Sequence, residues 1–117
     1  MKILVVDDSR GLAHIVKMML ADEDNEIRFA RDVRDGYLTF LLFKPDVVIT
    51  DIPPGENSSE LMESIRKYDP KIRAIYTCSD PAYLGPALAE EKTRFQVRLL
   101  PKPFSRSELV MLFSQFE

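Results

Sequence analysis

The chain has 117 residues, of which 45% are hydrophobic and 30% charged, and its formal net charge is −3. This size and composition predict one soluble globular domain over residues 1–117, and they exclude a disordered or fibrous chain. The net negative charge disfavours direct nucleic-acid binding, which needs clustered Lys and Arg. No apolar run approaches the roughly 20 residues that span a bilayer. The single cysteine, Cys78, fits a reducing cytoplasm rather than a disulfide scaffold.

Strand and helix patterns alternate from the start of the chain. The apolar run KILVVD predicts a strand over 2–7, and a three- and four-residue apolar spacing predicts a helix over 10–22, with Leu12, Ile15, Val16, Met19 and Leu20 on its inner face. The same reasoning predicts, in order, a strand over 26–30, a helix over 33–43, a strand over 46–51 and a helix over 59–68.

The second half of the chain continues the alternation. A strand over 72–77 precedes the stretch 80–92, where Pro81, Gly85 and Pro86 allow only a short or irregular helix. A strand over 95–100 and a helix over 105–116 follow, and Ser105 and Glu108 at the start of that helix have the spacing of a capping box. Such alternation predicts an α/β fold, with a parallel sheet covered by helices on both faces.

Polar residues follow the predicted strands at their carboxyl ends. Asp7 and Asp8 end the first strand, Asp51 ends the third, Thr77 ends the fourth, and Lys102 follows the fifth. Ligands of open parallel sheets bind at this edge. Alone, each residue is better explained as a turn, a helix cap or, in LPKPF, a rigid proline turn. Together, at the ends of four strands, they predict a shared site.

The chemistry of this set points to phosphoryl transfer. Crowded carboxylates repel one another unless a cation joins them, and oxygen ligands with room for water suit Mg²⁺. Mg²⁺ and Lys102 would then present positive charge to phosphoryl oxygens. An aspartate in such a site can act as the nucleophile and form an acyl phosphate.

The motifs ILVVDDSR, FKPDVVITD, AIYT and LLPKPF together resemble the receiver domains of two-component response regulators, over nearly the whole chain. The segment RDVRDGYLTFL, with Gly36, is similar to the second helix of that family. The resemblance implies a flavodoxin-like (βα)5 fold, a three-layer sandwich with strand order 2-1-3-4-5.

The resemblance also implies the roles of the site residues. A sensor histidine kinase or a phosphotransfer protein would transfer a phosphoryl group from a phosphohistidine to Asp51. Asp8 and Asp51 would ligate Mg²⁺ directly, Asp7 mostly through water, and Pro53 through its backbone carbonyl.

Thr77 and Lys102 would each contact a phosphoryl oxygen, and the Lys102–Pro103 peptide bond would be cis. Phosphorylation would rearrange the surface of the fourth helix, fifth strand and fifth helix, which would signal to an output domain or form a homodimer.

The sequence departs from the family pattern in three places. Leu99 stands where the family usually has Tyr or Phe, and Tyr76 should not replace that ring because neighbouring strand residues face opposite sides. The loop IPPGENSSEL (52–61) is one residue shorter than usual and has Asn57-Ser58 for the customary Asp-Gly. Cys78 replaces Ala or Gly and is expected to be a buried, inert thiol. His14, the single histidine, is expected to face solvent.

Two other functions compete with the phosphoacceptor switch. Leu99 and the altered loop allow a receiver that acts as a phosphorylation-independent docking module. The second alternative is a small phosphatase with an aspartate nucleophile. Its pattern places the two acids of the first strand two residues apart, whereas here they are adjacent, and no capping insertion is present. We therefore expect, at most, self-phosphorylation and autodephosphorylation at Asp51 rather than turnover of a separate substrate.

Overall fold

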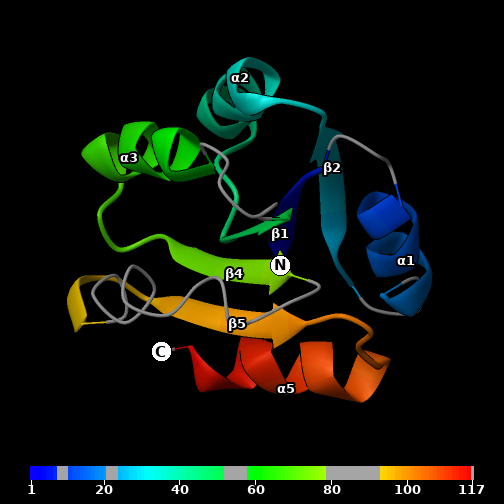
Figure 1. The fold of residues 1–117 in the computed structure, drawn as a ribbon. Coiled ribbons are helices and arrows are strands. Elements are labelled where there is room, and N and C mark those ends of the chain that lie inside the picture. The colour runs from blue at the N-terminus through cyan, green and yellow to red at the C-terminus, as the bar shows by residue number, and fades with distance from the viewer. Residues whose placement is uncertain (8–10, 21–23, 52–57, 79–92, 117) are drawn as a thin grey trace.

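Five parallel strands form one sheet with the order β2-β1-β3-β4-β5 (Figure 1). The computed structural model describes residues 1–7, 11–20, 24–51, 58–78 and 93–116, with only the backbone of residues 51, 58 and 59. The strands are β1 (Lys2–Val6), β2 (Glu26–Ala30), β3 (Val47–Asp51), β4 (Arg73–Cys78) and β5 (Val97–Pro101). The predicted α/β fold and its strand order are confirmed.

Helices cover both faces of this sheet. They are α1 (Gly11–Met19), α2 (Val33–Phe43), α3 (Ser58–Tyr68) and α5 (Arg106–Gln115). The helix predicted within 80–92 lies outside the described residues. Within the described part of the chain, no helix is both long and apolar enough to cross a membrane.

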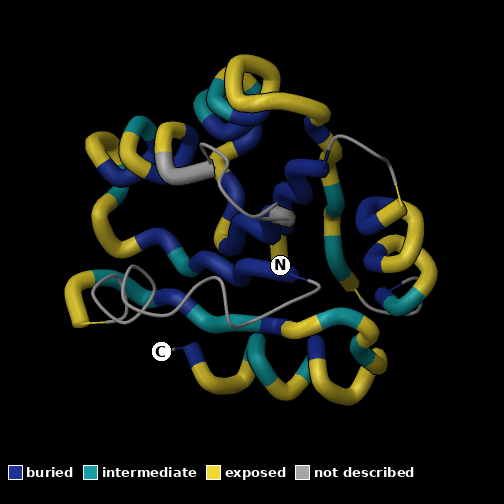
Figure 2. Tube along the Cα trace, in the orientation of Figure 1, coloured by how far each residue is buried: buried dark blue, intermediate teal, exposed yellow. Residues whose placement is uncertain are grey.

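The alternation of side chains along each strand divides the core into two clusters, one on each face of the sheet. On β1, Leu4 and Val6 join the cluster under α2 and α3, whereas Ile3 and Val5 join the cluster under α1 and α5. Figure 2 shows the strands of the sheet centre as buried and the outer sides of the helices as exposed. Both faces of the central strands are covered by helices, which explains why their sequences are continuous apolar runs.

The inner face of α1 differs from the prediction at one position. Ile15 was expected in the core but is 44% exposed, whereas Ala13 is buried. The buried arc of the helix is centred on Leu12, Val16 and Leu20, and Ala13 lies within that arc while Ile15 lies at its edge. The prediction was wrong because the apolar spacing alone does not fix where the buried arc of the helix is centred.

The start of α5 has the predicted capping box. Ser105 Oγ accepts a hydrogen bond from the Glu108 backbone N–H at 3.2 Å, and the Ser105 N–H donates to Glu108 Oε1 at 3.2 Å. One residue later, Arg106 Nε donates to the Met19 carbonyl at 2.8 Å. This contact joins the beginning of α5 to the end of α1.

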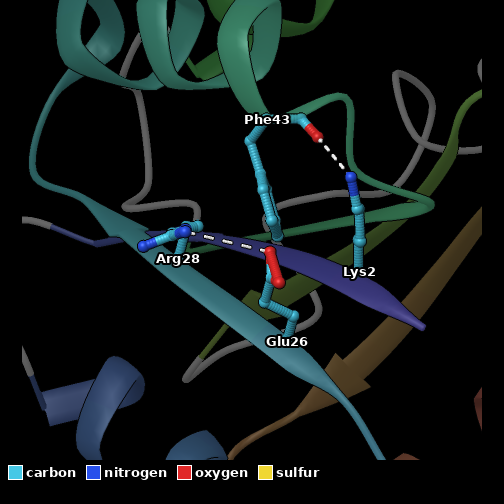
Figure 3. Close-up of polar contacts among 4 residues, drawn as sticks. All are labelled: Lys2, Glu26, Arg28 and Phe43. Atoms are coloured by element: carbon cyan, nitrogen blue, oxygen red, sulfur yellow. Dashed lines mark hydrogen bonds and ion pairs between the residues drawn. The ribbon is translucent and has the colours of Figure 1, made fainter.

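The helix α2 is held closely against its neighbours at both ends. A side chain at Gly36 would place its Cβ 3.3 Å from atoms of Leu61 and Val6, so glycine permits the close approach. At the other end, the Phe43 ring has Lys2 Nζ 5.3 Å and Arg28 Cζ 5.4 Å from its centroid (Figure 3). Lys2 Nζ also donates to the Phe43 carbonyl at 3.3 Å, which ties the end of α2 to the first strand.

The residue after α2 adopts a left-handed backbone. Lys44 has φ 54° and ψ 64°, and its N–H donates to the Phe40 carbonyl at 2.9 Å, as a helix C-cap does. Glycine is the residue best suited to this conformation, because a Cβ there crowds the following carbonyl.

Replacing Lys44 with glycine is therefore expected to raise the free energy of unfolding by about 0.5–1 kcal/mol, measured by urea denaturation. The matched control is Lys67→Gly, within the last turn of α3, where glycine should lower stability by about 0.5–1 kcal/mol. Equal loss of stability in the two variants would contradict the assigned cap.

Candidate functional site

The sheet brings the ends of four strands to one edge, where the predicted site residues stand. Asp51, the last residue of β3, pairs with Thr77 on β4, and Thr77 pairs in turn with Leu100 on β5. Neighbouring strands lie about 4.8 Å apart. The backbones of Asp51 and Thr77 are thus direct neighbours, and Lys102 starts two strands away from Asp51. A long side chain is required at that position to reach the acid.

Asp7, directly after β1, is buried and holds two elements together. Its Oδ2 accepts a hydrogen bond from the Leu12 N–H at 2.8 Å, and its own N–H donates to the Ala30 carbonyl at 3.0 Å. The first bond satisfies one of the unpaired N–H groups at the start of α1 and places negative charge at the positive end of the helix. This carboxylate is fixed before any ligand binds.

Thr77 and Lys102 are positioned by the last strand pair. Thr77 is fully buried. The Lys102 N–H donates to the Cys78 carbonyl at 2.8 Å, so the β4–β5 ladder continues past the end of β5. The Lys102–Pro103 peptide bond is cis, as expected from the resemblance.

The remaining predicted residues are described only in part. Asp8 and Pro53 lie outside the described residues, and Asp51 is described in its backbone alone. Among the side chains that are described, no three of His, Cys, Asp or Glu come together as a metal site. The predicted donor set, carboxylates and one backbone carbonyl, consists of the hard oxygen ligands that Mg²⁺ prefers, so its chemistry fits that ion.

Asp7 also borders a hollow that the sequence did not predict. A cavity of about 510 Å³ lies between α1, β2 and the start of α2, and its lining residues are Asp7, Ala13, His14, Lys17, Phe29, Ala30, Arg31 and Asp35. His14 is exposed, as predicted. It lies on the wall of this hollow, on the outer side of α1.

A second feature that sequence reasoning missed lies behind Thr77. Tyr76 and Leu99 pair across β4 and β5, and both pack in the cluster under α2 and α3. Ile75 packs in the other cluster, which confirms that alternate residues of β4 face opposite sides. The Tyr76 hydroxyl accepts a hydrogen bond from the buried Arg66 of α3. An arginine in a helix of mixed polarity gave no sign of this contact in the sequence.

The fold and the residues at its edge define a class: an α/β domain with a parallel five-stranded sheet and an acid, a hydroxyl and a lysine at the carboxyl ends of its strands. Residues 3–113 match the family model of the response regulator receiver domain, and the chain belongs to that family.

The curated relatives are longer proteins. The DNA-binding transcriptional regulator NtrC of Azospirillum brasilense is 31% identical over 109 residues, which make up 92% of this chain and 22% of that protein. NtrC of Rhizobium meliloti (strain 1021) is 26% identical over 109 residues, with 92% of this chain and 22% of that protein covered. The chain therefore spans about a fifth of the length of these relatives.

Solved receiver structures superpose closely on the fold. A response regulator receiver domain protein from Clostridium thermocellum has a TM-score of 0.81 and 26% identity, with 97% of this chain and 91% of that chain covered. The response regulator protein TrrA from Thermotoga maritima, solved in complex with Mg²⁺-BeF, has a TM-score of 0.80 and 26% identity, with coverages of 99% and 98%.

The single cysteine offers a test of how accessible the carboxyl end of β4 is to a reagent in solution. Cys78 is 3% exposed and pairs with Pro101, so its thiol should react with Ellman's reagent at least about 100-fold more slowly in the native protein than in urea. Release of the coloured thiolate measures both rates. Similar rates in the two conditions would show that the thiol is accessible and contradict the prediction of an inert cysteine.

Proposed function

We propose that residues 1–117 form a single receiver domain that acts as a phosphoacceptor switch, with Asp51 as the acceptor. The observation that carries this proposal is the direct pairing of Asp51 with Thr77, with Asp7 and Lys102 at the same sheet edge, in a chain of the receiver family. The phosphodonor would be a phosphohistidine on a sensor histidine kinase or a phosphotransfer protein, in the cytoplasm.

In the transfer step, a carboxylate oxygen of Asp51 attacks phosphorus while the bond from phosphorus to the donor's imidazole nitrogen breaks. The products are an aspartyl phosphate and an imidazole, which takes up a proton if it leaves as the anion. Mg²⁺, when bound, supplies positive charge to the phosphoryl oxygens. Asp8, Asp51 and the Pro53 carbonyl would hold it directly, and Asp7 mostly through water.

Lys102, Thr77 and Asp7 would stabilise the charge of the phosphoryl group or position the groups that bind it. Lys102 would pair with one phosphoryl oxygen, and its attachment to the Cys78 carbonyl fixes where its side chain begins. The Thr77 hydroxyl would donate to another phosphoryl oxygen. Because Asp7 is already bound to the start of α1, its charge is oriented without further reorganisation.

The switch follows from added charge. A phosphoryl group brings about −1.5 to −2 of charge at neutral pH, and the contacts of Thr77 and Lys102 with it exist only in the phosphorylated state. The change would reach an output domain or a second copy through the fourth helix, β5 and α5. The long NtrC relatives support a larger regulator around this domain.

The acceptor is tested with acetyl phosphate and Mg²⁺. Wild-type protein should gain the mass of one phosphoryl group, and beryllofluoride should shift amide signals of Asp51, Thr77 and Lys102 in NMR spectra. Asp51→Asn should lose both responses because an amide is a far weaker nucleophile than a carboxylate. The control Asp24→Asn, an exposed acid away from the strand ends, should keep both. A wild-type protein that shows neither response would reject the proposal.

The role of the hydroxyl is tested with Thr77→Val, which keeps the side-chain shape in a fully buried position. Uptake of phosphate should fall by about 10- to 100-fold, as for loss of one hydrogen bond to a charged group. The amide shifts along β5 and α5 on addition of beryllofluoride should shrink. Thr50→Val, at the buried residue before Asp51, is the matched control and should retain them. Full shifts in Thr77→Val would exclude the hydroxyl from signalling.

A further inference from the structure

A buried arginine connects α3, β4 and the start of β5. Arg66, in the last turn of α3, donates from Nη2 to the Tyr76 hydroxyl at 3.2 Å. Its Cζ lies 4.0 Å from the centroid of the Phe95 ring. Arg94 Cζ lies 5.2 Å from the same centroid, so two guanidinium groups contact this ring. We call Arg66, Tyr76 and Phe95 the arginine clasp.

The clasp is an unusual use of a core position. Arg66 is only 9% exposed, and burial of a guanidinium costs desolvation free energy that an apolar side chain would not incur. Its contacts are directional in return: a planar group stacks on Phe95 and donates to one hydroxyl. An aliphatic residue at position 66 would fill the space but would not fix the ring of Tyr76.

The clasp is one residue away from the proposed phosphate contact. Tyr76 precedes Thr77 on β4, and its ring lies on the opposite face of the sheet. A displacement of the Thr77 backbone must move the Tyr76 Cα, and the rigid ring carries that movement to the hydroxyl held by Arg66. In Figure 1, α3 and α5 lie on opposite sides of β4 and β5, so this route leads away from α5.

Leu99 makes no such connection. It packs beside Tyr76 in the same cluster but has no polar atom on its side chain and no ring to reorient. In the pair of Tyr76 with Leu99 the aromatic side chain belongs to β4 rather than β5, and its hydroxyl accepts a hydrogen bond from Arg66 of α3.

We infer that Arg66 is a positioning residue that couples the state of Thr77 to α3 and to the segment before β5, through the Tyr76 hydroxyl and the Phe95 ring. This inference rests on the proposed phosphoacceptor function. It adds a route through α3 to the one proposed through β5 and α5.

The test compares wild type with Tyr76→Phe, which removes one hydroxyl and keeps the ring. Addition of Mg²⁺ and beryllofluoride should shift the Arg66 Nε–H signal and the Phe95 amide in wild type. In Tyr76→Phe those two shifts should fall by about fivefold, the lower range of a coupling between sites. The responses at Thr77 and Lys102 should persist.

Two further variants separate coupling from packing. Tyr68→Phe removes a hydroxyl from an exposed tyrosine on the same helix and should behave as wild type. Arg66→Met keeps the bulk but not the donor, and the Phe95 shift should fall as it does in Tyr76→Phe.

The outcomes are distinct. Equal shifts in Tyr76→Phe and wild type, or a wild-type response at Thr77 and Lys102 that leaves Arg66 unmoved, overturns the clasp while the phosphoacceptor function stands. Absence of any response around Asp51 in wild type rejects the proposed function, and the clasp with it. Loss of the Thr77 response in Tyr76→Phe also overturns the inference, since the hydroxyl would then be part of the site itself.

Discussion

The parallel pairing of β1, β3, β4 and β5 is the constraint from which the rest of this molecule follows. In a parallel sheet every strand ends at the same edge, so residues far apart in the chain, such as Asp7 and Lys102, are brought to one edge. The register then sets their order across the edge: acid, acid, hydroxyl, lysine. A slip of one residue in β4 would place Tyr76 or Cys78 opposite Asp51 in place of Thr77.

Successive side chains of each strand point to opposite faces of the sheet, and the two faces differ in the side chains that they hold. The face under α1 and α5 holds an apolar cluster, and the neighbouring Asp7 is fixed at the start of α1. The other face is also apolar, but it contains a guanidinium and a phenol hydrogen-bonded to each other. Because strand residues on opposite faces share one backbone, a displacement of residue 77 on one face would also displace residue 76 on the other.

Sequence reasoning recovered the fold and the strand ends because both depend on local patterns. The apolar runs gave the strands, and the resemblance gave their order. Most boundaries differ by at most two residues, but α1 ends at Met19 rather than residue 22. The strand β5 begins at Val97 rather than residue 95, because Phe95 packs into the cluster before pairing begins. Ile15 was misplaced because a helical pattern cannot tell which of two neighbouring apolar residues lies nearest the sheet. The contact of Arg66 with Tyr76 and Phe95 was beyond prediction, since three residues from separate elements meet only in the folded chain.

The contact of Arg106 with the Met19 carbonyl joins residues 87 positions apart, and Phe116 packs in the same cluster as Ile3. The layer under α1 and α5 is thus built from segments far apart in the sequence, and its contacts close a very long loop. On the ribosome, the strands and α1 would emerge with that apolar face uncovered, and only synthesis through residue 116 would cover it. A chain that ended before α5 would leave this apolar face exposed and prone to aggregation.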